Sequence, residues 1–394
     1  MSPPLIRRLG VLGVLVSWCF DPAVGAEEAP PPPFTVESAR PYDALTRKFL
    51  STEGWTGSDD AYSFPLGPDR TLWVFADTWI GRIEDGRRVK PRMINNSFAW
   101  MSLADPAAPL KFFWNDAGPQ PRSVIPGGEN GVWMWPGDGA VVDGRCYFFG
   151  KRVRSRAEGR PGFRFHWFGD ELIRVDNPRD PPTGWKIDRR TFPEDPDALR
   201  PGVACVVDGR HLYAYGLLPK SLRRPGQDGP VGVQRIPLDR LAELDLAAWE
   251  TWVEGPEGPR WAAKPGTPAV LFRDGAPEFT VSRVPGIPGF VAVYTAYGMG
   301  PYLRARHAPR PEGPWSEYID VYTCPDSGEG IFVYAAKAHP ELATEDGRLI
   351  LTYCRNCGEL AEHVRQPGAY FPQAVEVRLA PKADNAKTEG GRRQ

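Results

Sequence analysis

Three carboxylates flank one predicted turn in the stretch GWTGSDDAYSFPLGPDRTLWVFADTW, which begins at Gly54. Aromatic and β-branched residues lie on both sides of Gly67-Pro68-Asp69-Arg70, a pattern typical of two strands joined by a short loop. If Leu66 pairs with Thr71, the constant index sum of antiparallel pairs places Asp60 opposite Asp77. Opposed Cβ atoms lie about 4.5 to 5.5 Å apart, so two such carboxylates repel unless one is protonated or a ligand lies between them. The stretch therefore predicts a working site at the open end of a hairpin.

The composition indicates which elements hold these residues. The chain has 394 residues, of which 41% are hydrophobic and 12% aromatic, enough for a large core in a single all-β domain. The 42 Gly and 44 Pro have no three-residue period and favour many tight turns between short strands. A formal charge of -1 argues against a nucleic-acid-binding protein and favours small or neutral substrates.

The two ends of the chain differ in composition from the rest. Two arginines, an apolar run and Val24-Gly25-Ala26 predict a secretory signal peptide over residues 1–26, and hence a secreted or periplasmic protein. Residues 27–40 include four prolines in a row and are interpreted as a linker, and residues 381–394 as a disordered tail. Five cysteines remain after cleavage, and Cys324, Cys354 and Cys357 are close enough in sequence to share a bridge.

A strand, a polar turn and a second aromatic strand recur five times along the chain. The five turns are centred on Asp69, Asp143, Asp208, Gly286 and Asp346. Their mean spacing of about 69 residues suits a four-stranded blade with its loops. We therefore predict a five-bladed β-propeller over residues 41–380, with antiparallel blades around a central channel and one short helical segment within 238–249.

In a propeller the first strand of each blade lines the channel, so the residues that open each hairpin should converge at one mouth. This rule brings together Asp59, Asp60, Asp138, Gly202, Glu278, His339 and Glu341. Three aromatic residues, Trp55, Trp133 and Trp135, lie just ahead of the first two inner strands and could stack on the apolar faces of sugar rings. An acidic mouth with aromatic neighbours indicates a carbohydrate substrate.

The motifs along residues 45–360 resemble those of the five-bladed β-propeller glycoside hydrolases, especially the D-arabinanase-like domain families and, more distantly, glycoside hydrolase families 43 and 32. The resemblance rests on GSDDAYS, LWVFADTWIG, MINNS, WPGDGAVVDGRCYFFG, GPWSE, YAAKAHPEL and LILTYCRN, in that order. It implies that Asp59 and Asp77 are the catalytic pair, with Asp138 and Glu278 in supporting or acid roles. The chain departs from the pattern at Asp60 and Ala76, where glycine is usual.

The partner of Asp77 stays open between Asp59 and Asp60, because the pairing above favours Asp60 and a one-residue bulge near Gly67 would select Asp59. Catalytic candidates are thus Asp59, Asp60, Asp77 and Glu278. One carboxylic acid would protonate the leaving oxygen and one carboxylate would act as nucleophile or base.

Further residues are expected to bind substrate: Trp55, Arg92, Asn96, Trp135, Asp138, His339 and Glu341. Arg92, Asn95 and Asn96 could contact sugar hydroxyls or orient Asp77. His339 could contact a sugar or hold an axial cation such as calcium, although no metal or other cofactor is required.

Two function classes follow from this reasoning. The first is a secreted, monomeric glycoside hydrolase that acts on furanose-rich, arabinan-like or related polysaccharide, with no nucleic-acid partner and no membrane contact after signal cleavage. The second is a noncatalytic carbohydrate- or protein-binding propeller.

Overall fold

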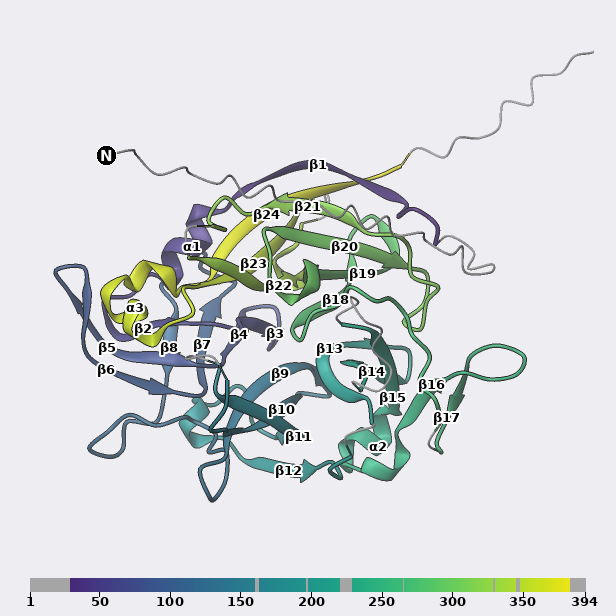
Figure 1. The fold of residues 1–394 in the computed structure, drawn as a ribbon, viewed down its shortest axis with the longest axis horizontal. Helices are drawn as coiled ribbons and strands as arrows, with labels where there is room; N and C mark the ends of the chain where they lie inside the picture. Colours follow the sequence, from purple (N-terminus) through teal and green to yellow (C-terminus); the bar gives the residue numbers. More distant parts are fainter. Residues whose placement is uncertain are drawn as a thin grey trace, which may run out of the picture.

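The computed structural model describes residues 29–159, 163–195, 198–219, 229–264, 266–328, 330–344 and 348–382. These residues form an all-β fold built of antiparallel sheets, as the composition predicted (Figure 1). The predicted signal peptide, the turn at Asp346 and residues 383–394 of the predicted tail lie outside the described residues.

Five sheets of four or five strands follow one another along the chain. Sheet I contains β3 (Tyr62–Pro65), β4 (Arg70–Phe75), β7 (Ser97–Ser102) and β8 (Lys111–Phe113). Sheet II contains β9 (Trp133–Val142), β10 (Arg145–Ser155), β11 (Phe165–Val175) and β12 (Ile187–Thr191). Sheet III contains β13 (Arg200–Asp208), β14 (His211–Leu217), β15 (Val231–Pro237), β16 (Glu250–Val253) and β17 (Arg260–Ala262).

The last two of the five sheets complete the series. Sheet IV contains β18 (Phe279–Val284), β19 (Ile287–Thr295), β20 (Tyr302–Ala308) and β21 (Ile319–Thr323). Sheet V contains β22 (Phe332–His339), β23 (Arg348–Asn356), β24 (Gln373–Pro381) and β1 (Phe34–Pro41). A sixth, three-stranded sheet consists of β2 (Glu53–Ser58), β5 (Thr78–Glu84) and β6 (Arg87–Ile94).

Short helical segments connect the strands. The α-helices are α1 (Asp43–Phe49), α2 (Leu238–Ala242) and α3 (Leu360–Arg365). The 3₁₀ turns are η1 (Pro182–Gly184), η3 (Leu246–Ala248), η4 (Ala296–Gly298), η5 (Pro340–Leu342) and η6 (Pro367–Ala369). The predicted helical segment within 238–249 is confirmed by α2 and η3.

The first strands of sheets I to V lie innermost, and each contacts the first strand of the next sheet (Figure 1). The contacts run from β3 to β9, β13, β18 and β22, and β22 also contacts β3. Five hydrophobic clusters fill the spaces between successive sheets, as where Phe64 of sheet I stacks on Phe148 of sheet II at 6.3 Å. The sheets are thus arranged as in a β-propeller, with the inner strands around a common centre.

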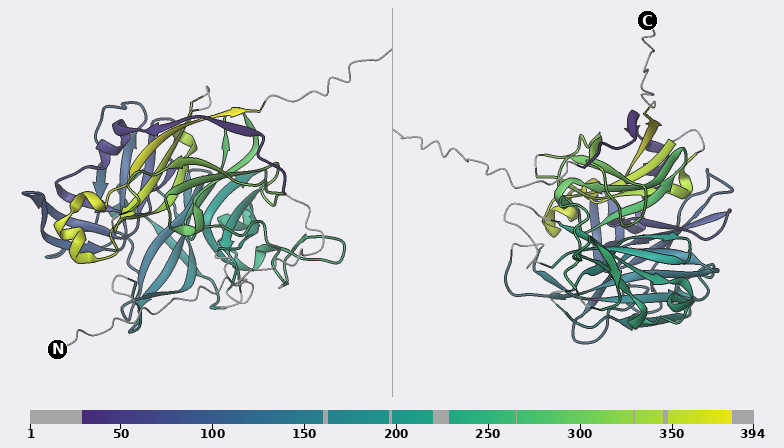
Figure 2. Two further views of the ribbon diagram at one scale, coloured as in Figure 1. Left: turned by 45° about the horizontal axis from the view of Figure 1, so that its top comes forward. Right: turned by 90° about the vertical axis from the view of Figure 1, so that its right-hand side faces the viewer.

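The linker prediction for residues 27–40 is wrong from Phe34 onward. Residues 34–41 form β1, which pairs with β24 from Phe34 opposite Pro381 to Pro41 opposite Val375. Figure 2 shows the two strands side by side, although they come from opposite ends of the chain. The reason is that β24 offers a free edge, and an extended segment gains backbone hydrogen bonds by pairing with it.

Four of the five predicted turns lie in described residues, and each joins the first two strands of its sheet. The chain turns at residues 67–69, 143–144, 209–210 and 285–286. Asp208 itself is the last residue of β13, where it pairs with His211. The predicted hairpins are therefore confirmed at these four positions.

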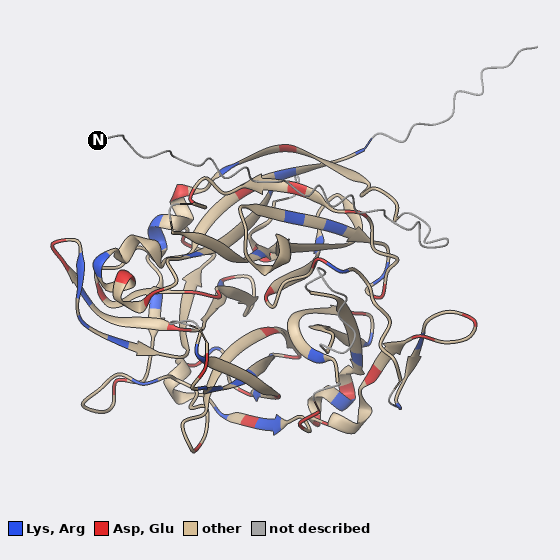
Figure 3. Cartoon of the chain, in the orientation of Figure 1, with Lys and Arg blue, Asp and Glu red and all other residues tan. Residues whose placement is uncertain are grey.

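In the view of Figure 3, charged residues of both signs are mixed over the described part of the chain. Among the described residues, no helix has the length and hydropathy needed to cross a bilayer.

Candidate active site

The site begins at the sharp turn between β2 and β3, where neighbouring aspartates separate. Asp60 and Ala61 have positive φ angles of 72° and 61°, which reverses the chain within two residues. The Asp59 N–H donates to the Asp77 carbonyl at 3.4 Å, and the Ala76 N–H donates to the Asp59 carbonyl at 3.4 Å. Asp59 is therefore the residue that faces Asp77.

The predicted pairing of Leu66 with Thr71 is wrong by one residue. Pro65 pairs with Thr71, and the Leu66 N–H donates to the Arg70 carbonyl at 2.9 Å. The loop closes with three residues, 67–69, because Gly67 takes a φ of 136° that other residues rarely adopt. The shift places Asp59 rather than Asp60 opposite Asp77, as the family resemblance implied.

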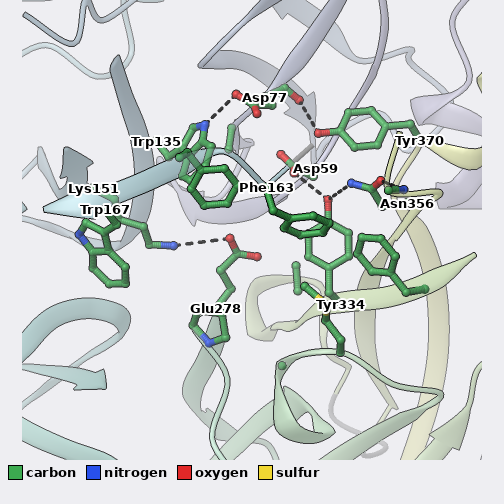
Figure 4. Close-up of a pocket in the computed structure, with 18 of the residues that line it drawn as sticks. Asp59, Asp77, Trp135, Lys151, Phe163, Trp167, Glu278, Tyr334, Asn356 and Tyr370 are labelled. Atoms are coloured by element: carbon green, nitrogen blue, oxygen red, sulfur yellow. Dashed lines mark hydrogen bonds and ion pairs between the residues drawn. The ribbon is translucent and has the colours of Figure 1, made fainter. Parts of the chain in front are cut away.

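A cavity of about 220 Å³ lies over this pair of aspartates. Figure 4 shows the carboxyl groups of Asp59, Asp77 and Glu278 directed into it, with aromatic rings around them. The aromatic lining comes from Trp135, Phe163, Phe165, Trp167, Phe332, Tyr334 and Tyr370. Segments that are far apart in the sequence thus come together to form one acidic, aromatic pocket.

Asp77 is held by two donors on one oxygen. Its Oδ1 accepts from Asn95 Nδ2 at 2.8 Å and from Trp135 Nε1 at 2.7 Å (Figure 4). Burial raises the pKa of Asp77 to about 6, although both hydrogen bonds counteract the rise. The predicted orienting role of this segment is therefore filled by Asn95.

Asp59 has a different environment. Its Oδ2 accepts from the Tyr334 hydroxyl at 2.7 Å, and its Oδ1 is buried without a hydrogen-bond partner among the described residues. Burial and then the charges of Asp77 and Glu278 raise the pKa of Asp59 well above its usual value. These surroundings therefore favour the protonated form of the Asp59 carboxyl group.

Glu278 enters the pocket from the residue just before β18. Its side chain is 20% exposed, and Lys151 Nζ lies 3.6 Å from its Oε1. Lys151 stands opposite Trp135 in the pairing of β9 with β10, which explains why both side chains reach the same pocket.

Asp60 and Asp138 lie beneath the pocket and do not line it. Asp60 is 1% exposed, and its Oδ1 lies 3.1 Å from Lys337 Nζ. Asp138 accepts backbone N–H groups of Gly139 at 2.8 Å and Cys205 at 2.7 Å, which ties sheet II to sheet III. Burial raises the pKa of Asp60 to about 6 and that of Asp138 to about 7.

His339 and Glu341 were expected at the mouth, and they do not line the pocket. They come at and after the end of β22, whereas the pocket receives Phe332 and Tyr334 from its start. Both ring nitrogens of His339 are engaged, Nδ1 with Ser63 Oγ at 2.6 Å and Nε2 with Thr352 Oγ1 at 2.8 Å.

Three other expected contacts are also absent from the pocket lining. Trp55 is buried in the core, where it donates to Ser97 Oγ at 3.1 Å and stacks on Phe112. Asn96 donates to the carbonyls of Ile125 and Met134, and Arg92 is exposed on β6. Trp135 is the expected aromatic residue that does line the pocket.

No bridge joins Cys324, Cys354 and Cys357, because all five cysteines of the described residues are free thiols. Within the same residues, no group of three His, Cys, Asp or Glu side chains could hold a metal ion.

Several pocket residues were missed by sequence reasoning: Lys151, Trp167, Tyr334, Asn356 and Tyr370. Tyr334 could have been found, since it lies near the start of an inner strand, where the mouth was expected. The turn register would have pointed to Arg152 instead of Lys151, because a bulge between Phe148 and Gly150 shifts the pairing and places Lys151 opposite Trp135.

An all-β propeller-type fold with an acidic, aromatic pocket over its inner strands defines the general class of this protein. The chain belongs to the family described as domain of unknown function DUF5005, which matches residues 41–378. No curated protein is significantly similar in sequence.

Among solved structures, a candidate hydrolase from Bacteroides ovatus ATCC 8483 is similar with a TM-score of 0.70 and 18% identity, over 86% of this chain and 90% of that chain. At this identity the likeness concerns the fold. The GH43_1 enzyme from Xanthomonas citri in complex with xylotriose is less similar, with a TM-score of 0.44 and 16% identity over 87% and 93% of the two chains. Trypanosoma rangeli sialidase has a TM-score of 0.43 and 11% identity, over 87% and 60%.

Proposed function

We propose that this protein is a glycoside hydrolase whose chemistry is carried by Asp59 and Asp77, with Glu278 as the third carboxyl group. The observation that carries the proposal is the pairing of these carboxyl groups in one aromatic pocket, with unequal environments. Groups whose surroundings separate their pKa values can divide the roles of acid and base.

The division of roles follows from the surroundings of each group. The raised pKa of Asp59 favours its protonated form, which can give a proton to the leaving oxygen of a glycosidic bond. Asp77 has a pKa of about 6 and is mostly ionised at pH 7, so it can act as base or nucleophile. Glu278 lies between the ammonium groups of Lys151 and Lys337, and its carboxyl group is the third acidic group that could stabilise an oxocarbenium-like transition state.

The pocket walls fit a sugar. Trp135, Trp167 and Phe165 present apolar ring surface that can stack on sugar faces, while Lys151 and Asn356 offer hydrogen-bond donors. Ligand pockets commonly have volumes of about 300 to 1,000 Å³. A cavity of about 220 Å³ is below that range and favours a site that encloses few sugar units.

The fold in this proposal is a closed, five-bladed β-propeller in which sheets I to V are the blades. The contacts of the inner strands in sequence, and of β22 with β3, support it. The pairing of β1 with β24 supports it as well, since joining both chain ends in one blade is a way to close a ring.

Substrate and location rest on sequence. The resemblance to D-arabinanase-like families favours a furanose-rich, arabinan-type polysaccharide, and the signal-like start of the chain favours a secreted or periplasmic monomer.

The test is reducing-end release from a panel of plant and bacterial polysaccharides that includes arabinans, measured with the wild type and with D59N/D77N. The wild type should cleave at least one glycan, and the double variant should not cleave it. Calorimetric titration of the same glycans into both proteins separates binding from cleavage. A wild type that binds glycans and cleaves none would refute the hydrolase and identify a carbohydrate-binding propeller.

A further inference from the structure

A fully buried lysine lies directly beneath the pocket, on the inner strand β22. Lys337 has a side-chain exposure of 0%, and its Nζ lies 3.1 Å from Asp60 Oδ1 and 3.9 Å from Glu278 Oε2. Resting on the proposed function, we propose that Lys337 is a positioning residue, whose ammonium group stabilises the carboxylate of Glu278 and directs it into the pocket.

The Glu278 carboxylate has a cation on each side. Lys151 Nζ lies 3.6 Å from Oε1, and Lys337 Nζ lies 3.9 Å from Oε2, which is buried and makes no hydrogen bond to any residue that the structure describes. A buried carboxylate oxygen without a hydrogen bond is costly unless nearby charges compensate it. The two lysines therefore supply the compensation that direct hydrogen bonds do not.

Lys337 is itself fixed in place. Its Nζ donates to the Ala335 carbonyl at 3.2 Å and lies 4.2 Å from the centroid of the Tyr62 ring. Burial alone lowers the pKa of Lys337, but the charges of Asp60 and Glu278 outweigh it and place that pKa above its usual value. The raised pKa therefore favours the charged ammonium form of Lys337.

The charges around this lysine are unbalanced. The titratable groups that act on Lys337 and Glu278 come from several elements: Asp59, Asp60, Tyr62, Asp77, Asp138, Lys151, His339 and Cys354. The aspartates and Glu278 outnumber the two lysines, so losing one ammonium group leaves the carboxyl groups with less compensation. The nearest of them, Asp60 and Glu278, must then hold protons over a wider pH range.

A purely structural role would differ in a measurable way. If Lys337 served only to compensate the charge of Asp60, the double variant D60N/K337M would fold and its Glu278 would behave as in the wild type. If Lys337 acts on Glu278, the same double variant would fold, but the titration midpoint of Glu278 would still differ from that of the wild type. If K337M does not fold, the double variant takes its place in the experiment.

The experiment is ¹³C NMR titration of protein labelled at the glutamate Cδ, with the Glu278 signal assigned by its absence in E278Q. The titration midpoint of Glu278 should move to higher pH by one unit or more in K337M. It should also move to higher pH in D60N/K337M. D60N alone, which removes an anion, should move it to lower pH. An unchanged midpoint in both Lys337 variants would overturn the proposal.

This measurement does not depend on turnover. A wild type that cleaves no glycan would refute the proposed function, while the titration would still decide the role of Lys337. If a glycan is cleaved, kcat/KM of D60N/K337M at pH 6 should fall at least tenfold and recover in part at pH 8. A kcat/KM profile equal to that of the wild type would also overturn the proposal.

Discussion

Asp59 and Asp77 meet through their backbones, since the Asp59 N–H donates to the Asp77 carbonyl at 3.4 Å. Their side chains enter the same pocket, while Asp60, one residue further on, turns to the buried Lys337. The left-handed conformations of Asp60 and Ala61 produce this separation. The side chains of these two adjacent aspartates therefore lie in different places, Asp59 in the pocket and Asp60 beneath it.

Activity should depend on pH with a bell-shaped profile. Asp77 must be ionised, so kcat/KM should fall as the pH drops through about 6. Asp59 must be protonated, and its pKa is raised well above its usual value, so kcat/KM should fall again at higher pH as that proton is lost. Initial rates on one cleaved glycan between pH 4 and pH 10 check this. Activity that keeps rising below pH 5 would exclude Asp77 as the ionised group.

Replacing Trp135 by phenylalanine should move the acidic side of this profile. W135F removes the indole donor to Asp77 Oδ1, and that hydrogen bond lowers the pKa of Asp77. The pKa of Asp77 should therefore rise, and kcat/KM should begin to fall at a higher pH than in the wild type.

The matched control is W167F. Trp167 lines the same pocket, but its Nε1 donates to the Gly169 carbonyl and to Asp170. This variant should change KM and leave the acidic side of the profile in place. Equal shifts in both variants would show that the hydrogen bond to Asp77 is not the cause.

A buried ion network that joins Asp274 to β20 should dominate the stability of sheet IV. Asp274 lies 3.1 Å from Arg304 and 2.8 Å from Arg306, and it also accepts from the Tyr294 hydroxyl at 2.9 Å. D274A leaves two buried guanidinium groups without this partner, which should cost about 3 to 5 kcal/mol in the free energy of unfolding.

Chemical denaturation measures this cost, with D208N as the control. Asp208 pairs with Arg283 at the surface, and such exposed pairs contribute about 0 to 1 kcal/mol. A D274A protein as stable as D208N would show that the network contributes little.

Local features of the sequence were enough to predict the hairpins, the all-β class and the three carboxyl groups of the pocket. Turn residues such as Asp143-Gly144 act through their own backbone preferences and need no distant partner. The predicted register of the first hairpin was wrong. Whether the loop at Gly67 has three or four residues depends on a backbone conformation that the amino-acid sequence alone does not specify.

The residues that were misplaced depend on contacts between sheets. His339 was assigned to the mouth, although the pocket is formed by the start of β22 and His339 lies at its end. Lys337 was missed because a lysine in a strand is usually exposed, and its burial makes sense only with Asp60 and Glu278 in view. The linker was misassigned because a proline-rich start conceals a strand that pairs with the other end of the chain.

The most direct test is the rate of reducing-end release from one cleaved glycan by the wild type, D59N, D60N and D77N. Each replacement keeps the size of the side chain, so a change in rate reports on the carboxyl group. Loss of a general acid or base typically costs about 10² to 10⁴-fold. D59N and D77N should each fall at least that far, while D60N should retain more activity than either. A D59N or D77N enzyme with the wild-type rate, or a D60N enzyme that falls as far as both, would contradict the assignment of catalysis to Asp59 and Asp77.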